Sequence, residues 1–178
     1  MVYFSFLQVK GAHSWKMLWE RDFWGHDNLK SSSSHKSWRP LCTATYRVYY
    51  LLAGDSPFWF HVTDRLLNAS VSVLVLLAAL SCFRTTTDDH GLLRRRTEVS
   101  AVLAACFFTV HPVHVEAVAN STGRAEVLSA LCALSGFVFY TRFVKTGASS
   151  PMQHQCVDSA TAVGGMLLFS FCSMLSKV

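Results

Sequence analysis

The sequence predicts an all-α protein, a polytopic bundle of membrane helices with an interfacial or luminal segment at its N-terminus. Apolar residues make up 51 % of the 178 residues, and they gather in four long runs that polar loops separate. We expect a luminal or juxtamembrane segment over 1–57 and a partial transmembrane domain over 58–178. That domain should hold about four membrane helices, at 58–83, 98–111, 125–143 and 160–176.

Charge and cysteine content exclude two other classes of protein. The net charge is +5, but Lys and Arg are dispersed among the loops and no recognition motif accompanies them. We therefore expect no nucleic acid partner and take membrane lipids as the partner of the basic loops. Six cysteines stand at wide spacings, which does not indicate a zinc site or a disulfide framework.

Residues 1–57 are polar and rich in aromatic side chains, which favour the membrane interface. Beyond Pro40, residues 41–53 should form a helix that lies along the membrane surface and ends at Gly54. Lys36 and Arg39 stand just before this helix. They belong either to a solvated loop or to an edge that binds anions.

The segment 58–83 is long enough to cross a hydrocarbon layer of roughly 30 Å, which needs about 20 helical residues. Polar side chains recur in its first half at steps of three and four residues and so share one helix face, which should point into protein: His61, Asp64, Arg65, Asn68 and Ser72. Alternatively, Asp64 and Arg65 are interfacial anchors near the helix end.

The next connection, 84–97, contains three consecutive arginines at 94–96. Arginines close to membrane spans favour the cytosolic side, so 1–57 and the stretch around His111 should be luminal. The apolar run Val99 to Val110 has only twelve residues. It would rise about 18 Å as a helix, so we expect this helix to run on into His111.

Two imidazoles, two carboxylates and a guanidinium follow within sixteen residues, from His111 to Glu126. Ionisable groups so close to hydrocarbon are costly and usually have partners, which indicates a polar site facing substrate or ions. An ordinary polar loop is the alternative. Pro112 either begins a new helix or kinks the old one.

The geometry of this stretch stays open. A helix would place His111 and His114 on one face, whereas an extended chain would align His114 with Glu116. The spacing differs from the H-E-x-x-H zinc signature, so a divalent metal is left undecided.

The last two spans carry a packing signal. In 125–143, small residues recur at four-residue intervals in two rows, Ala125, Ser129 and Ala133 in one and Cys132 and Gly136 in the other, which predicts close contact with another helix. Residues 146–158 are expected to form a polar connection to the final span.

Six motifs, in order along the chain, are similar to those of a known family: Asp22-Phe-Trp-Gly25, His35-Lys-Ser-Trp-Arg-Pro-Leu41, Phe60-His61 leading into Arg65-Leu-Leu-Asn68, His111-Pro-Val-His-Val-Glu-Ala-Val118, Gly123-Arg-Ala-Glu126 and Leu175-Ser-Lys177. Together they resemble the transmembrane and tetratricopeptide-repeat (TMTC) family of protein O-mannosyltransferases, roughly over residues 15–177.

The resemblance implies a multi-pass glycosyltransferase of the GT-C type in the endoplasmic reticulum membrane. Its donor would be dolichyl-phosphate mannose, and its acceptors Ser or Thr of secretory-pathway proteins such as cadherins. The family's upstream span and luminal acidic motif, its later spans and its repeats have no counterpart here. We therefore expect a fragment that is inactive alone, with the catalytic carboxylate upstream.

The implied reaction is an inverting displacement, in which cations stabilise the departing lipid phosphate. Candidate neighbours of that phosphate are Lys36, Arg39, His111, His114 and Arg124. Supporting residues are His61, Asp64, Glu116 and Glu126. The polar region that runs from Arg39 into the first half of the span 58–83 should meet the region from His111 to Glu126 at one luminal site, because the span after Arg39 and the span before His114 are antiparallel neighbours.

Two other functions remain open on the residues alone. One is a segment of a transporter, whose solute path would be lined by His61, Asp64 and Asn68. The other is a membrane scaffold that keeps the fold without activity.

Overall fold

A computed structural model describes residues 15–20, 23, 37–54, 56–83, 91–120, 123–147 and 152–177. Every element within these residues is a helix, so the predicted all-α fold is confirmed. The helices are α2 (Trp15–Glu20), α3 (Pro40–Ala53), α4 (Pro57–Phe83), α5 (Gly91–Val110), α6 (Val113–Ala119), α7 (Arg124–Gly147) and α8 (Met152–Lys177).

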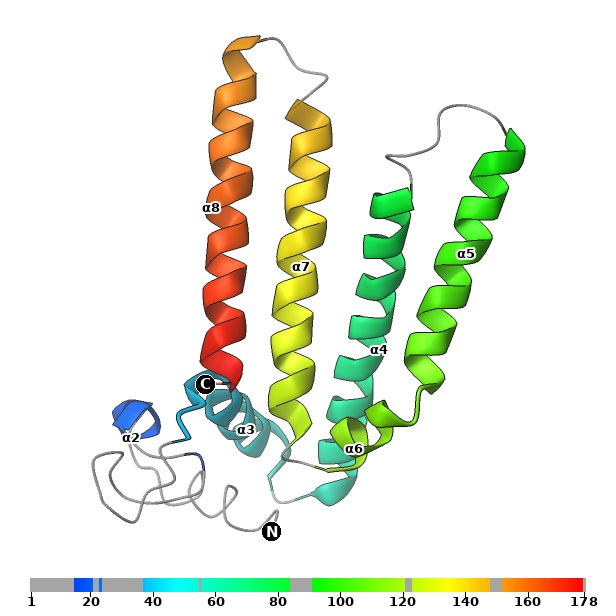
Figure 1. The fold of residues 1–178 in the computed structure, drawn as a ribbon. Helices are drawn as coiled ribbons and strands as arrows, with labels where there is room; N and C mark the ends of the chain where they lie inside the picture. The colour runs from blue at the N-terminus through cyan, green and yellow to red at the C-terminus, as the bar shows by residue number, and fades with distance from the viewer. Residues whose placement is uncertain are drawn as a thin grey trace.

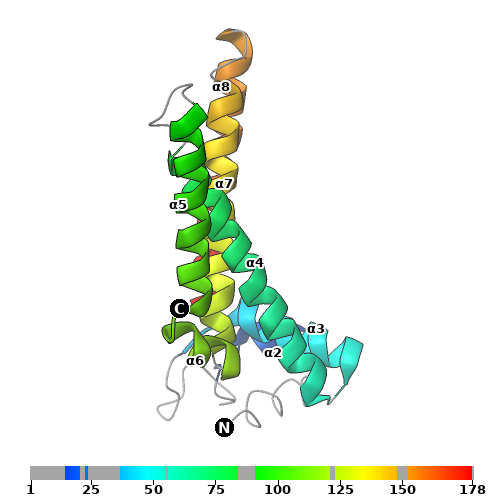
Figure 2. The same cartoon turned by 90° about the vertical axis from the view of Figure 1, so that its right-hand side faces the viewer.

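The four long helices stand side by side in the order α8, α7, α4, α5, as Figures 1 and 2 show. Helix α7 packs between α8 and α4, and α4 also packs against α5. Helices α4 and α7 run in one direction and α5 and α8 in the other. The starts of α4 and α7 therefore meet the last turns of α5 and α8. Helices α3 and α6 lie at this end, which we call the α3 end of the bundle.

Three helices are long and apolar enough to cross a membrane, namely Pro57–Phe83, Arg124–Val144 and Ala160–Lys177. These match three of the four predicted spans. Among the described helices α5 does not qualify, although it has 20 residues. Arginines at 94–96 and Glu98 occupy its first turns, which leaves only the twelve-residue, mostly apolar run Val99–Val110.

Two helices begin earlier in the sequence than the predicted spans. Helix α5 does not run into His111 but ends at Val110, and its extra length comes from an earlier start at Gly91. Arginine and leucine are good helix formers, so the charged turns join the helix. Helix α8 begins at Met152, inside the predicted polar connection 146–158, but its membrane-length apolar part, Ala160–Lys177, agrees with the predicted span 160–176. By contrast, the predicted helix over 41–53 agrees with α3 within one residue.

The buried core is small and lies at the α3 end. It joins one face of α3 to the first turns of α4 and α7 through Phe23, Cys42, Tyr46, Tyr49, Phe60, Ala125 and Leu128. Elsewhere the long helices expose large apolar side chains, including Leu66, Val73, Phe107 and Leu167. Because lipid tails are as apolar as leucine, these exposed faces suit helices surrounded by a bilayer.

Helices α7 and α8 approach closely through small residues. The Ser129 and Ser173 hydroxyls lie 2.9 Å apart, and Ser173 also donates to the Ser129 carbonyl at 3.0 Å. Buried Gly136 faces Phe169 one to two turns further along. The predicted small-residue contact is confirmed at Ser129 and Gly136, whereas Ala133 is exposed.

We expect Gly136→Ala to destabilise the protein by about 1–3 kcal/mol, as overpacked cores do. A Cβ atom at this position would lie 2.8 Å from the Cβ of Phe169, which cannot rotate away. Gly164→Ala is the matched control, because a Cβ there meets no atom within 4 Å. Thermal unfolding in detergent measures both variants. Equal unfolding temperatures for the two would contradict the close approach of α7 and α8.

Candidate functional site

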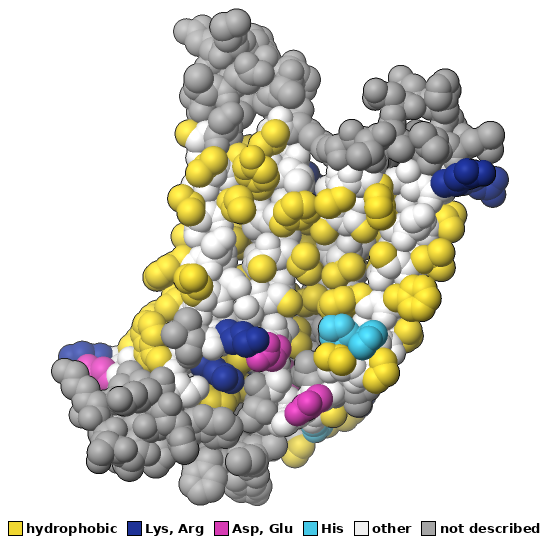
Figure 3. All heavy atoms as spheres, in the orientation of Figure 1, with side chains coloured by type: hydrophobic (Ala, Val, Ile, Leu, Met, Phe, Trp, Pro, Cys, Tyr) yellow, Lys and Arg dark blue, Asp and Glu magenta, His cyan; other side chains and the backbone are white. Residues whose placement is uncertain are grey.

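A polar pocket of about 610 Å³ opens at the α3 end of the bundle. Side chains from the start of α3 and from α4, α5, α6 and α7 line it: Arg39, Asn68, Val71, Phe108, Val113, His114, Glu116, Asn120, Gly123, Glu126, Val127 and Ala130. In Figure 3 basic, acidic and histidine side chains gather at this end, below the apolar side chains of the long helices. We call this cavity the α3-end pocket.

The histidine side of the α3-end pocket depends on a break at Pro112. Helix α5 ends at Val110, and Pro112 is the N-cap of the new helix α6. The turn is closed by the His114 amide, which donates to the His111 carbonyl at 3.0 Å, and by the Val113 amide, which approaches Nδ1 of His111 at 3.3 Å. Of the two alternatives for Pro112, the structure adopts the new helix.

His114 and His111 occupy different positions as a result. The His114 ring is half-buried, lies 4.1 Å from the Phe108 ring between centroids, and lines the pocket. His111 is exposed and does not line it. The ring of His111 lies 6.1 Å from the ring of His114, and its Nδ1 accepts the hydrogen bond from the Val113 amide that closes the turn. Glu116, one half-turn beyond His114 in α6, also lines the pocket and is exposed.

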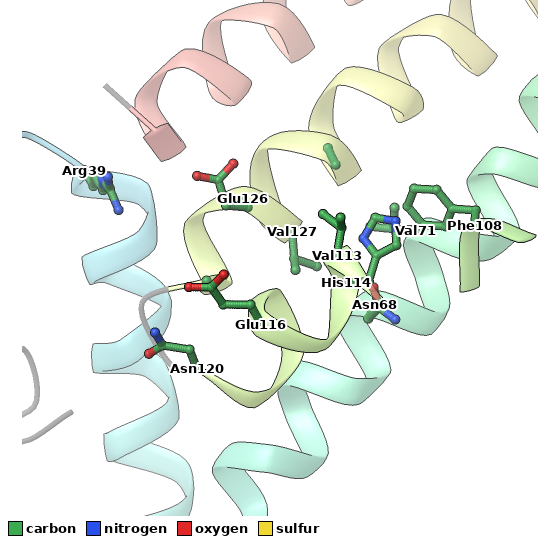
Figure 4. A pocket seen from close by; sticks show the side chains of 12 residues that line it. Arg39, Asn68, Val71, Phe108, Val113, His114, Glu116, Asn120, Glu126 and Val127 are labelled. Carbon is green, nitrogen blue, oxygen red and sulfur yellow. The ribbon is translucent and has the colours of Figure 1, made fainter. Parts of the chain in front are cut away.

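Arg39 occupies the opposite side of the pocket, as Figure 4 shows. It is the N-cap residue of α3, and its carbonyl accepts hydrogen bonds from the Thr43 amide at 3.0 Å and the Thr43 hydroxyl at 2.9 Å. Its guanidinium carbon lies 4.9 Å from the centre of the Phe23 ring. The buried Nε of Arg39 has no hydrogen-bond partner, so this donor is unsatisfied.

Glu126 links the pocket to the last turn of α8. Its Oε2 lies 2.5 Å from Nζ of Lys177, and both side chains are about half exposed. Lys177 was missing from the residues proposed from sequence, although it belongs to the last family-like motif. The two residues are 51 positions apart in the sequence, so spacing gave no signal for the pair.

Arg124 lies in the buried core and pairs with Asp64. Its Nε donates to Oδ1 of Asp64 at 2.6 Å, and the two side chains are 2 % and 4 % exposed. A second guanidinium nitrogen donates to the Thr63 hydroxyl at 3.1 Å. Three aromatic rings surround the cation, at centroid distances of 4.1 Å for Phe60, 4.7 Å for Tyr46 and 6.0 Å for Tyr49. Arg124 is therefore buried and paired within the core, and its predicted place beside the donor phosphate stays a prediction.

The side chains of the polar face predicted on α4 lie in three different environments. Asp64 points into the core toward Arg124, Asn68 lines the α3-end pocket, and His61 is exposed with its ring 6.1 Å from that of Phe60. Asp64 is thus not an interfacial anchor, and the three residues do not line one path. Lys36 lies outside the described residues.

Two ionisable groups close to Arg39 and Arg124, the Cys42 thiol and the Tyr46 hydroxyl, carry no charge. Burial raises the pKa of the Cys42 thiol to about 11. It also raises the pKa of the Tyr46 hydroxyl, so both groups stay protonated near neutral pH. Among the described residues, no group of three or more His, Cys, Asp or Glu side chains is placed to hold a metal ion.

Sequence comparisons find relatives of this chain among the TMTC proteins. Mouse protein O-mannosyl-transferase TMTC4 is 42 % identical over 133 residues, which are 73 % of this chain and 18 % of TMTC4. Mouse TMTC1 is 36 % identical over 163 residues, 90 % of this chain and 16 % of TMTC1. Tmtc1 of Drosophila melanogaster is 36 % identical over 177 residues, 96 % of this chain and 19 % of that protein. The chain is homologous to the TMTC protein O-mannosyltransferases.

The chain spans less than a fifth of the length of these TMTC relatives. No protein-family profile matches it. No solved structure matches it significantly either. Within the described residues, the TMTC-like motifs gather at the α3 end: they supply Arg39, Asn68, His114, Glu116, Gly123 and Glu126 to the pocket and Lys177 to its rim.

Proposed function

We propose that this chain forms the part of a TMTC-type protein O-mannosyltransferase that holds the lipid-linked sugar donor, dolichyl-phosphate mannose. The observation that carries the proposal is the α3-end pocket, in which one cation and two carboxylates converge: Arg39, Glu116 and Glu126. Homology to the TMTC proteins supports a sugar donor and a protein acceptor. The proposed location is the endoplasmic reticulum membrane, with the α3 end on the luminal side.

Each part of the donor has a chemically suited side of the pocket. Arg39 lines the pocket and would offer its guanidinium to the phosphate, because guanidinium groups bind phosphate in a planar, two-point contact. Glu116 and Glu126 would accept hydrogen bonds from mannose hydroxyls. Val71, Phe108 and Val113 form an apolar wall toward α4 and α5 along which an isoprenoid chain would run.

The proposed reaction moves mannose from phosphate to a hydroxyl. The oxygen of an acceptor Ser or Thr, in proteins such as cadherins, bonds to the anomeric carbon while the carbon–oxygen bond to phosphate breaks. Dolichyl phosphate leaves with the bonding electrons, and a carboxylate takes the acceptor's proton. Arg39 would stabilise the charge that grows on the departing phosphate, and His114 would orient the sugar.

Photocrosslinking tests the proposal in the purified 178-residue protein in lipid nanodiscs. A polyprenyl-phosphate mannose that carries a diazirine on the sugar should label peptides containing Arg39 or residues 113–126. Unlabelled dolichyl-phosphate mannose should protect these peptides, whereas dolichol, which lacks the phosphate and sugar, should not. Equal protection by dolichol, or labelling confined to the opposite end of the bundle, would contradict the proposed donor site.

A further inference from the structure

Lys177 places a second cation at the rim of the α3-end pocket. Its ammonium group contacts Glu126, which lines the pocket, at 2.5 Å. The side chains are 53 % and 48 % exposed, so water reaches both groups. Figure 4 shows Glu126 between the Arg39 side and the His114 side of the cavity. Lys177 is thus paired with a residue that lines the proposed donor site, and its charge is engaged by Glu126.

We propose that Lys177 is a second phosphate-binding residue of this pocket, and that Glu126 competes with the bound phosphate for it. The proposal rests on the proposed donor site. When an anionic ligand enters, the Lys177 ammonium turns from Glu126 to a phosphate oxygen. Glu126 is then free to accept a hydrogen bond from the sugar.

Separating an exposed ion pair costs little free energy. Ion pairs in contact with solvent contribute little to stability, because water screens the attraction and solvates each partner once they separate. Glu126 keeps access to water after it loses Lys177, so no charge is left buried. The Asp64–Arg124 pair in the same end of the bundle is fully buried and cannot open in this way.

A phosphate at Arg39 needs a further donor. The non-bridging oxygens of a phosphodiester offer more acceptor sites than one guanidinium satisfies. Among the described residues that line the pocket, Arg39 is the only Lys or Arg. Lys177 reaches the rim without lining the cavity, which suits a flexible side chain carrying a compact charge.

The backbone that carries Lys177 is fixed independently of the ion pair. Ser173 lies one turn earlier in α8, and its hydroxyl makes hydrogen bonds with the hydroxyl and the carbonyl of Ser129 in α7. Ser176 is fully buried, and its hydroxyl donates to the Cys172 carbonyl at 3.0 Å. Loss of the Glu126–Lys177 contact therefore frees a side chain and leaves the end of α8 in place.

The test compares three variants in the full chain, Lys177→Gln, Glu126→Gln and Arg39→Gln, by equilibrium binding of polyprenyl phosphate in nanodiscs. This ligand has no sugar, so the competition for Lys177 is seen alone. Lys177→Gln should weaken binding roughly 10-fold, as loss of a charge-assisted hydrogen bond does. Glu126→Gln should tighten it about threefold, because the exposed ion pair no longer opposes the ligand.

Opposite signs for the two partners separate this role from a structural one. If the ion pair only held α7 to α8, both substitutions would weaken binding together and lower the unfolding temperature together. That result, or unchanged affinity in both variants while Arg39→Gln binds weakly, overturns the role of Lys177 and leaves the donor site standing. Wild-type binding no stronger for polyprenyl phosphate than for polyprenol overturns both.

Discussion

Asp64→Ala is expected to destabilise the protein by about 3–5 kcal/mol, the usual cost of removing one partner from a buried ion pair. The substitution leaves the Arg124 guanidinium uncompensated in a core where it is 2 % exposed. The Thr63 hydroxyl and the surrounding aromatic rings remain, but they do not replace a carboxylate at 2.6 Å. Because Arg124 is the first residue of α7, the pocket residue Glu126 should lose its position as well.

Thermal unfolding in detergent measures this effect against two reference variants. Glu20→Ala removes one partner of the exposed Lys16–Glu20 pair, whose atoms lie 3.7 Å apart, and should change stability by less than about 1 kcal/mol. The double variant Asp64→Leu with Arg124→Met removes both buried charges and should recover most of the loss. Asp64→Ala as stable as Glu20→Ala would show that the buried pair does not hold the α3 end together.

The helices were largely predictable from sequence because long apolar runs have one stable solution in a bilayer. The errors lie where polar residues continue a helix. Nothing in a hydrophobicity pattern distinguishes a charged loop from charged helical turns, so the first turns of α5, around residues 94–96, and of α8, from Met152, were assigned to connections. Where these helices end depends on tertiary packing. Helix α5 also ends because of Pro112, which lies two residues after its last residue, Val110.

The gathering of Arg39 and His114 at one end of the bundle was predictable from sequence, but the ion pairs at that end were not. Counting spans placed Arg39 and His114 at the same end, and the two residues do line one pocket. Their part in donor binding stays a prediction. Sequence could not show that Arg124 pairs with a residue 60 positions away or that Glu126 pairs with Lys177, because such contacts follow from how α4, α7 and α8 pack. A charged residue in a family-like motif looks the same whether it binds ligand or holds the fold.

Arg39→Ala is expected to weaken binding of dolichyl-phosphate mannose roughly 10- to 100-fold, the range for loss of hydrogen bonds to a charged group. Among the described residues that line the pocket, Arg39 is the only Lys or Arg, so it would supply the positive charge that a phosphate needs. The fold should survive, because Arg39 contacts the core through its carbonyl and one cation–π contact with Phe23. An unchanged unfolding temperature checks this.

The most direct test of the central claim, that the α3-end pocket holds the donor phosphate, is donor binding by Arg39→Ala and Arg65→Ala side by side. Arg65 carries the same charge near the start of α4, is exposed, and does not line the pocket. Equilibrium binding of dolichyl-phosphate mannose to the 178-residue protein in nanodiscs should be weakened by Arg39→Ala and unchanged by Arg65→Ala. Equal affinities of wild type and Arg39→Ala, or equal losses in the two variants, would contradict the claim.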